Sequence, residues 1–174
     1  MQAAARTFFS SPTFAVAGAS SNTAKFGHKI FAWYLLRSLP AIPLNPGCSS
    51  ITVGQTSHNT VASPSQLPDP KATSLSVITP PAVTRELLRE AKAAGVRAVW
   101  LQPGSFGDEE WEFAVKEWPG AAVGGFGEGT RGGEGWCVLV DGDRAMKEAG
   151  REGKLEESIR AARNLSSRID NEYD

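Results

Sequence analysis

One stretch decides the fold, FAVAGASSNTAKFG at residues 14–27. Its first four residues have the length and flanks of a buried strand. Gly18 breaks the apolar run, small and hydroxylated residues follow, and a helical pattern begins at about Lys25. This arrangement suits a phosphate, because exposed backbone N–H groups and the positive end of the helix dipole both favour an anion. The stretch therefore predicts a phosphate site, although small residues after a strand are also ordinary turn residues.

The composition favours a single soluble domain that binds a small anion. The chain has 174 residues, of which 41% are hydrophobic and 21% charged, and no apolar run approaches the roughly 20 residues that span a bilayer. Residues 1–68 hold four basic and no acidic side chains, whereas residues 69–174 hold 14 basic and 19 acidic ones, which gives a net charge of -1. Four basic residues are too few for a nucleic-acid surface.

The two ends of the chain are predicted to flank a domain at residues 13–150. Residues 1–12 are predicted as an N-terminal extension, which faintly resembles a mitochondrial presequence because it has Arg6 and no acid. Two cysteines, Cys48 and Cys137, favour a reducing compartment. We expect a cytoplasmic protein, with the mitochondrial matrix as the alternative. Residues 151–174 are predicted as a helical tail that packs on the body or on a second subunit, as in a homodimer.

Strands and helices alternate along the body of the chain. Helices are predicted at residues 25–39, between Pro81 and Gly95, and at 108–118, and strands at 14–17, 42–44, 75–78 and 98–101. Residues 48–73 are predicted as a surface excursion with one extended piece near 51–55. This alternation predicts an α/β fold of the Rossmann-like, doubly wound type, with a mainly parallel sheet of about five strands and helices on both faces.

Two segments compete for the fifth strand. Residues 121–123 are short, whereas residues 136–140 (Trp-Cys-Val-Leu-Val) are longer and more hydrophobic, and we favour the second. Between them, seven glycines lie in residues 124–135. This glycine-rich loop is predicted to be mobile, with a lid or a second anion site as the functional alternative.

Each predicted strand ends in a compact turn, at residues 18–20, 44–46, 79–81 and 101–104. The carboxyl ends of parallel strands meet at one edge of a sheet, and ligands bind there at the point where the strand order reverses. The spacing of the four turns therefore predicts one ligand site.

These turns carry a resemblance to a known family. The matching pieces are Val16-Ala17-Gly18-Ala19-Ser20 with Lys25-Phe26-Gly27, Ile42-Pro43-Leu44-Asn45-Pro46, Thr79-Pro80-Pro81 and Val99-Trp100-Leu101-Gln102-Pro103-Gly104. On them the chain resembles the stand-alone CoA-binding domain family, which is similar to the CoA-binding Rossmann-like domain of the succinyl-CoA synthetase α subunit. The resemblance implies a diphosphate at the first turn, a nucleotide moiety at the second and third, and a pantetheine arm near Gln102 and Pro103. The chain departs from the family where the glycine-rich loop precedes Cys137.

The residues themselves also favour CoA. NAD-binding sheets carry an acid after the second strand, but this chain has Asn45-Pro46-Gly47 there and no acid before Asp69. NADP would need a nearby arginine, and none lies between Arg37 and Arg85. No paired carboxylates or nucleophile–histidine pair is visible among the turns. We expect a module that binds CoA or a short acyl-CoA rather than an enzyme, with a small NADP-binding oxidoreductase or reductase subunit as the alternative.

The residues predicted to bind the cofactor lie in or beside the four turns. They are Gly18, Ala19, Ser20, Ser21, Lys25, Phe26, Gly27, Asn45, Pro46, Thr79, Pro80, Pro81, Gln102, Pro103 and Gly104. Lys25 is predicted at the phosphates, since it stands where the first turn enters the helix. No catalytic or metal-binding residue is predicted.

Overall fold

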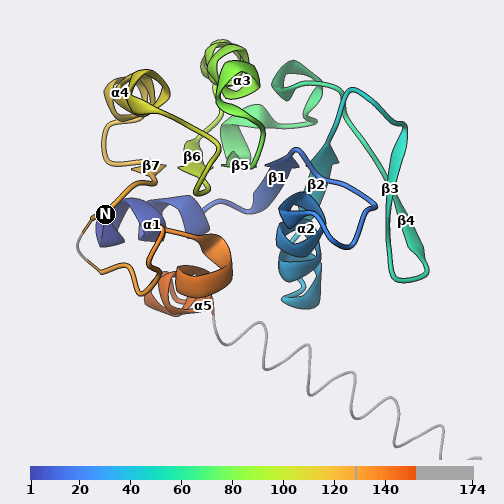
Figure 1. Cartoon of the computed structure of the whole chain (residues 1–174), viewed down its shortest axis with the longest axis horizontal. Coiled ribbons are helices and arrows are strands. Elements are labelled where there is room, and N and C mark those ends of the chain that lie inside the picture. Colours follow the sequence, from blue (N-terminus) through green and yellow to red (C-terminus); the bar gives the residue numbers. More distant parts are fainter. Residues whose placement is uncertain (128, 152–174) are drawn as a thin grey trace, which may run out of the picture.

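The computed structural model describes residues 1–127 and 129–151, and its centre is a five-stranded parallel sheet (Figure 1). The strands are β1 (Thr13–Ala17), β2 (Ala41–Leu44), β5 (Thr73–Val77), β6 (Ala98–Leu101) and β7 (Ala122–Val123). Their order is β2-β1-β5-β6-β7, and every neighbouring pair is parallel. This order belongs to the doubly wound folds, so the predicted fold class is confirmed.

Helices cover both faces of the sheet (Figure 1). They are α1 (Gln2–Phe9), α2 (Phe26–Leu36), α3 (Pro81–Ala94), α4 (Asp108–Glu117) and α5 (Val138–Glu148). Side chains alternate along a strand, so Leu75 and Val77 of β5 pack with the face of α3 and α4. On the other face, Phe14 of β1 and Trp100 of β6 pack with α1, α2 and α5.

A small hairpin lies between β2 and β5. It consists of β3 (Ser50–Val53) and β4 (Thr56–Asn59), which pair antiparallel. Two short 3-10 helices follow, Pro64–Gln66 and Pro70–Ala72. The extended piece predicted near residues 51–55 corresponds to β3. Its partner β4 was not predicted, because its residues Thr-Ser-His-Asn carry no apolar signal.

Helix α1 was not predicted, since residues 1–12 were taken as an extension of the domain. In the structure its apolar face is buried, with Phe8 and Phe9 fully enclosed. Two buried serines form hydrogen bonds at the end of this helix. Ser74 Oγ of β5 donates to Phe8 O at 2.9 Å and lies 2.6 Å from Ser11 Oγ. Small side chains on β5 thus leave room for α1, and the buried hydroxyls are hydrogen-bonded.

The prediction that residues 136–140 form the fifth strand is wrong. The short segment Ala122–Val123 forms β7, and Val138 begins helix α5. The buried residues Val138, Asp141, Ala145 and Met146 recur at helical spacing. Asp141 is fully buried, and its carboxylate accepts hydrogen bonds from the backbone N–H groups of Arg131 and Cys137 at 2.9 and 3.2 Å. The apolar run is therefore the entry of a helix, and a buried carboxylate in its first turn binds the loop that leads into it.

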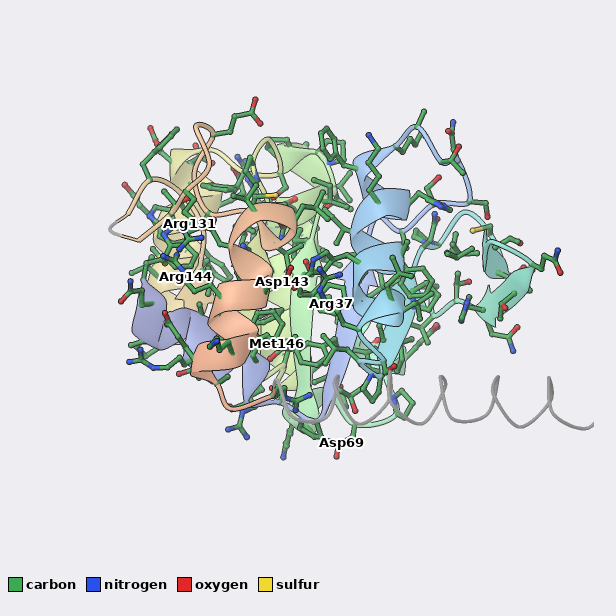
Figure 2. All side chains as sticks on the ribbon, turned by 90° about the horizontal axis from the view of Figure 1, so that it is seen from below. Arg37, Asp69, Arg131, Asp143, Arg144 and Met146 are labelled. Atoms are coloured by element: carbon green, nitrogen blue, oxygen red, sulfur yellow. The ribbon has the colours of Figure 1, made fainter. Side chains whose placement is uncertain are left out.

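Helix α5 is also fixed to its neighbour α2. Arg37 Nη2 donates to Asp143 Oδ2 at 2.7 Å, and Figure 2 shows the two side chains near one another between these helices. The predicted C-terminal tail lies outside the described residues, apart from Arg151. No helix of the described residues combines the length and the apolar character that crossing a bilayer requires.

Truncating the aromatic core under α1 tests the role of this helix. The Phe9 ring lies within 5.3 to 6.0 Å, centroid to centroid, of the rings of Phe8, Phe14, Trp33 and Trp100. We expect Phe9→Ala to lower the free energy of unfolding by about 3 to 5 kcal/mol, because it empties a fully buried site. Urea denaturation followed by circular dichroism measures the change.

The matched control is Leu36→Ala, because Leu36 is 77% exposed and its loss is expected to change stability by less than about 0.5 kcal/mol. If Phe9→Ala were as stable as this control, helix α1 would contribute nothing to the core.

Candidate functional site

The site begins where β2, β1 and β5 end together. Backbone pairing continues one residue past β1, since Gly18 N donates to Leu44 O at 3.1 Å and Ile78 N donates to Ala17 O at 3.0 Å. The turns that follow these three strands therefore start at the same level of the sheet. They meet at the β1–β5 boundary, where the strand order reverses.

Two glycines determine how the first turn enters α2. Gly18 has φ +87°, in the region that side-chain-bearing residues rarely adopt. A Cβ atom at Gly27 would lie 2.0 Å from Gly18 O, so only glycine fits at position 27. The start of α2 is thereby held against the end of β1. The first N–H groups of a helix have no partner within the helix, and here they belong to the same turn as Gly18.

Hydrogen bonds within the first turn hold its shape. Ser20 Oγ accepts from Asn22 N at 3.1 Å, and Asn22 Oδ1 accepts from Ala24 N at 3.0 Å. His28 Nδ1 of α2 lies 3.0 Å from Ser20 O. Ser21 Oγ accepts from Thr52 N at 2.9 Å, which ties the turn to the β3–β4 hairpin.

Side chains of the second and third turns brace the site. Asn45 Nδ2 donates to Ala19 O at 2.8 Å, and Asn45 Oδ1 accepts from Gly47 N at 2.8 Å. Thr84 Oγ1 of α3 donates to Thr79 O at 3.0 Å, and the two threonine hydroxyls lie 2.8 Å apart. Asn45 therefore joins the second turn to the first, while Thr84 holds the third turn on its helix.

Two hollows open at this edge of the sheet, on either side of Gly18 and Thr79. The α2 hollow has a volume of about 440 Å³, and Lys25, Phe26, Gly27, Ile78 and Pro80 are among its lining residues. The α3 hollow has a volume of about 290 Å³ and lies between the second turn and α3. Both hollows are lined by Gly18 and Thr79, so they are the two halves of one site across the switch point.

The two hollows differ in charge. Lys25 is the basic residue of the α2 hollow, and it stands at the N-terminus of α2, where the helix dipole adds positive potential. In the α3 hollow the charged lining residues are Glu86 and Glu90, and none of the described residues that line it is basic. The site is thus positive at one end and negative at the other.

Comparison with known proteins identifies the family. Residues 12–126, more than half of the chain, match the family model described as the CoA binding domain. The chain belongs to the CoA-binding domain family. This match covers β1 to β7 and both hollows, and it confirms the resemblance on which CoA was predicted.

Solved structures agree with this membership. A conserved hypothetical protein from Pyrococcus furiosus is 30% identical with a TM-score of 0.53, over 60% of this chain and 86% of its own. A Thermus thermophilus protein is 29% identical with a TM-score of 0.54, over 67% of this chain and 85% of its own. A hypothetical protein from Pyrococcus horikoshii OT3 has the same fold. It is 19% identical with a TM-score of 0.59, over 68% of this chain and 80% of its own. No protein with a curated description matches the chain.

The hollows bring together about half of the residues predicted to bind CoA. Those that line a hollow are Gly18, Lys25, Phe26, Gly27, Asn45, Pro46, Thr79 and Pro80. Ala19 is fully buried, Ser20 and Ser21 bond within the first turn and to the hairpin, and Pro81 is the first residue of α3. Their contacts with the cofactor stay predictions.

The fourth turn is placed differently from the other three. Gln102 is fully buried; its Nε2 donates to Ser76 Oγ at 3.0 Å and its Oε1 accepts from Val138 N at 2.9 Å. Gln102, Pro103 and Gly104 are absent from the lining of both hollows. The Gln102 side chain thus fixes the start of α5 to the sheet, and its predicted place beside a pantetheine arm is not supported by these contacts.

Sequence reasoning missed the wall that α3 supplies. Val83, Glu86, Leu87 and Glu90 line the α3 hollow, and their spacing of three or four residues places them on one helical face. From the sequence, Pro81 is the one residue of this helix predicted at the site, and the lack of an acid after β2 disfavours NAD. In the structure the carboxylates beside Asn45 and Pro46 come from α3 and not from the segment after β2.

Adding one methyl group to Gly27 tests the geometry of the first turn. We expect Gly27→Ala to lower the free energy of unfolding by about 2 to 3 kcal/mol, because the new Cβ would collide with Gly18 O. Urea denaturation gives the loss. The control is Gly133→Ala, where a Cβ would meet nothing within 4 Å; an equal effect of the two substitutions would show that α2 does not press on the turn.

Proposed function

We propose that this chain is a non-catalytic module that binds CoA or a short acyl-CoA across the two hollows. The observation that supports this most is the charged, two-part site at the switch point of a CoA-binding-domain fold. A CoA-type ligand has a diphosphate between a nucleoside and a pantetheine arm, and two hollows that join at the first turn offer a place for each part.

The diphosphate is assigned to the first turn and the start of α2. Backbone N–H groups at a helix N-terminus bind anions, and the absence of a side chain at Gly27 lets α2 start directly against Gly18, so these groups stand in the first turn. Lys25 adds a full positive charge on the same side. Residues Ser20 to Ala24 hold this turn in place through their own hydrogen bonds, so the ligand meets a preformed surface.

The two arms of the ligand are assigned by the chemistry of the linings. The α3 hollow combines apolar side chains, such as Leu44 and Leu87, with hydrogen-bonding groups such as Asn45 and Ser63, as an adenosine requires. The α2 hollow is lined by Phe26, Ile78 and Pro80. Phe26 is 57% exposed, and the pantetheine arm would cover this ring.

The histidines near the site have structural contacts, which supports a binding role. His28 Nδ1 lies 3.0 Å from Ser20 O, and the His58 ring packs edge-on against Phe31 with centroids 5.2 Å apart. Among the described residues, no three His, Cys, Asp or Glu side chains are grouped so that they could hold a metal ion.

Ligand-induced stabilisation tests the proposal. A ligand that binds only the folded state stabilises it by about 2.7 kcal/mol at a concentration of 100 times its Kd. We therefore expect CoA to raise the melting temperature in differential scanning fluorimetry, and Lys25→Glu to reduce the shift strongly because it places like charge beside the diphosphate.

The matched control is Lys116→Glu, an exposed charge reversal on α4 that is expected to leave the CoA shift intact. Absence of any shift at millimolar CoA would contradict the proposal, and a larger shift with NADPH than with CoA would favour the oxidoreductase alternative.

A further inference from the structure

The α3 hollow has an acidic wall that the proposed function does not by itself explain. Glu86 and Glu90 lie one helical turn apart on α3 and both line the hollow, with Leu87 between them. The facing lining includes Pro46 and Ser63 from the segment after β2. The wall stands in a defined cavity of about 290 Å³ that is continuous with the first turn, so any nucleoside in this hollow meets the two carboxylates.

Glu90 is held in place as a carboxylate. Ser65 Oγ donates to Glu90 Oε1 at 2.8 Å, and Ser63 Oγ lies 2.9 Å from Ser65 Oγ. Hydrogen bonds from Ser63 and Ser65 hold the pKa of Glu90 below its ordinary value. Among the described residues its polar partners are these hydroxyls, so no basic side chain neutralises its charge.

The negative charge of Glu86 is neutralised only in part. Arg89 Nη1 lies 2.5 Å from Glu86 Oε1, but both side chains are mostly exposed, at 59% and 70%, and exposed pairs of this kind are weak. Arg89 is not among the lining residues, and Lys25 belongs to the α2 hollow. None of the described residues that line the α3 hollow is basic, so a phosphate group placed there meets carboxylates and no lining cation.

From this wall we propose that the α3 hollow selects an adenosine whose ribose carries no 3′-phosphate, so that dephospho-CoA binds more tightly than CoA. This rests on the proposed function, because it assumes that the nucleoside occupies the α3 hollow. A carboxylate accepts hydrogen bonds from ribose hydroxyls, as the acidic residue of NAD-binding sheets does. The same carboxylate repels a 3′-phosphate, most effectively at Glu90, which is less exposed than Glu86.

Titration calorimetry with a pair of ligands tests this selection. Wild-type protein is titrated with dephospho-CoA and with CoA, and we expect the first to bind about fivefold to tenfold more tightly. Glu90→Gln keeps the side-chain shape and removes the charge, so it is expected to bring the two affinities to within about twofold, mainly by strengthening CoA binding. Glu112→Gln removes an exposed charge on α4 and is expected to leave the preference unchanged.

The outcomes separate this inference from the proposed function. Equal or tighter binding of CoA by the wild type, or a preference that survives in Glu90→Gln, would overturn the selection while CoA binding stands. Failure of both ligands to bind at millimolar concentration would overturn both. A second pair, AMP and adenosine 3′,5′-bisphosphate, repeats the test on the wild type alone; AMP must bind more tightly, and the reverse order refutes the selection without reference to any variant.

Discussion

The contact between Gly27 and the carbonyl of Gly18 is the constraint on which the site depends. A Cβ at Gly27 would lie 2.0 Å from Gly18 O, so the backbone of α2 touches the end of β1 with nothing between them. This contact fixes where α2 starts relative to the sheet. It leaves Lys25 at the rim of the α2 hollow and Gly18 between the two hollows. The geometry proposed for anion binding is therefore a consequence of how a helix packs against a strand, without the dinucleotide glycine fingerprint.

The rest of the fold keeps this edge of the sheet open. Stability comes from the two faces, where α1, α2 and α5 bury an aromatic cluster and α3 and α4 bury an aliphatic one. Two polar side chains in the core hold elements together: Ser74 of β5 bonds the end of α1, and Gln102 joins β5 to α5. At the carboxyl edge, in contrast, the side chains of Asn45 and Thr84 donate hydrogen bonds to backbone carbonyls of the turns. They shape the site and leave its surface accessible to a ligand.

Much of this could be predicted from local patterns, and the failures have physical causes. Short apolar strands followed by small-residue turns predicted the parallel sheet, the helices on both of its faces and the first three turns of the site. Helix α1 was missed because its signal is the burial of Phe8 and Phe9 against distant strands. Residues 136–140 were taken as a strand because they are longer and more hydrophobic than residues 121–123, and nothing local shows that Asp141 is buried and continues the same helical face. Glu86 and Glu90 were not predicted at the site, since nothing local shows that α3 faces the end of β2.

We propose that the bends after β1, β2 and β5 form one binding surface for a CoA-type ligand. The most direct measurement is a titration of ¹⁵N-labelled protein with CoA, followed by amide chemical shifts. We expect shifts to concentrate in the amides of residues 18–27, of Asn45 and Gly47, and of Ile78 and Thr79, with those of the first turn changing most. Shifts confined to the β3–β4 hairpin or to the glycine-rich loop, with the amides of the first turn unmoved, would contradict it.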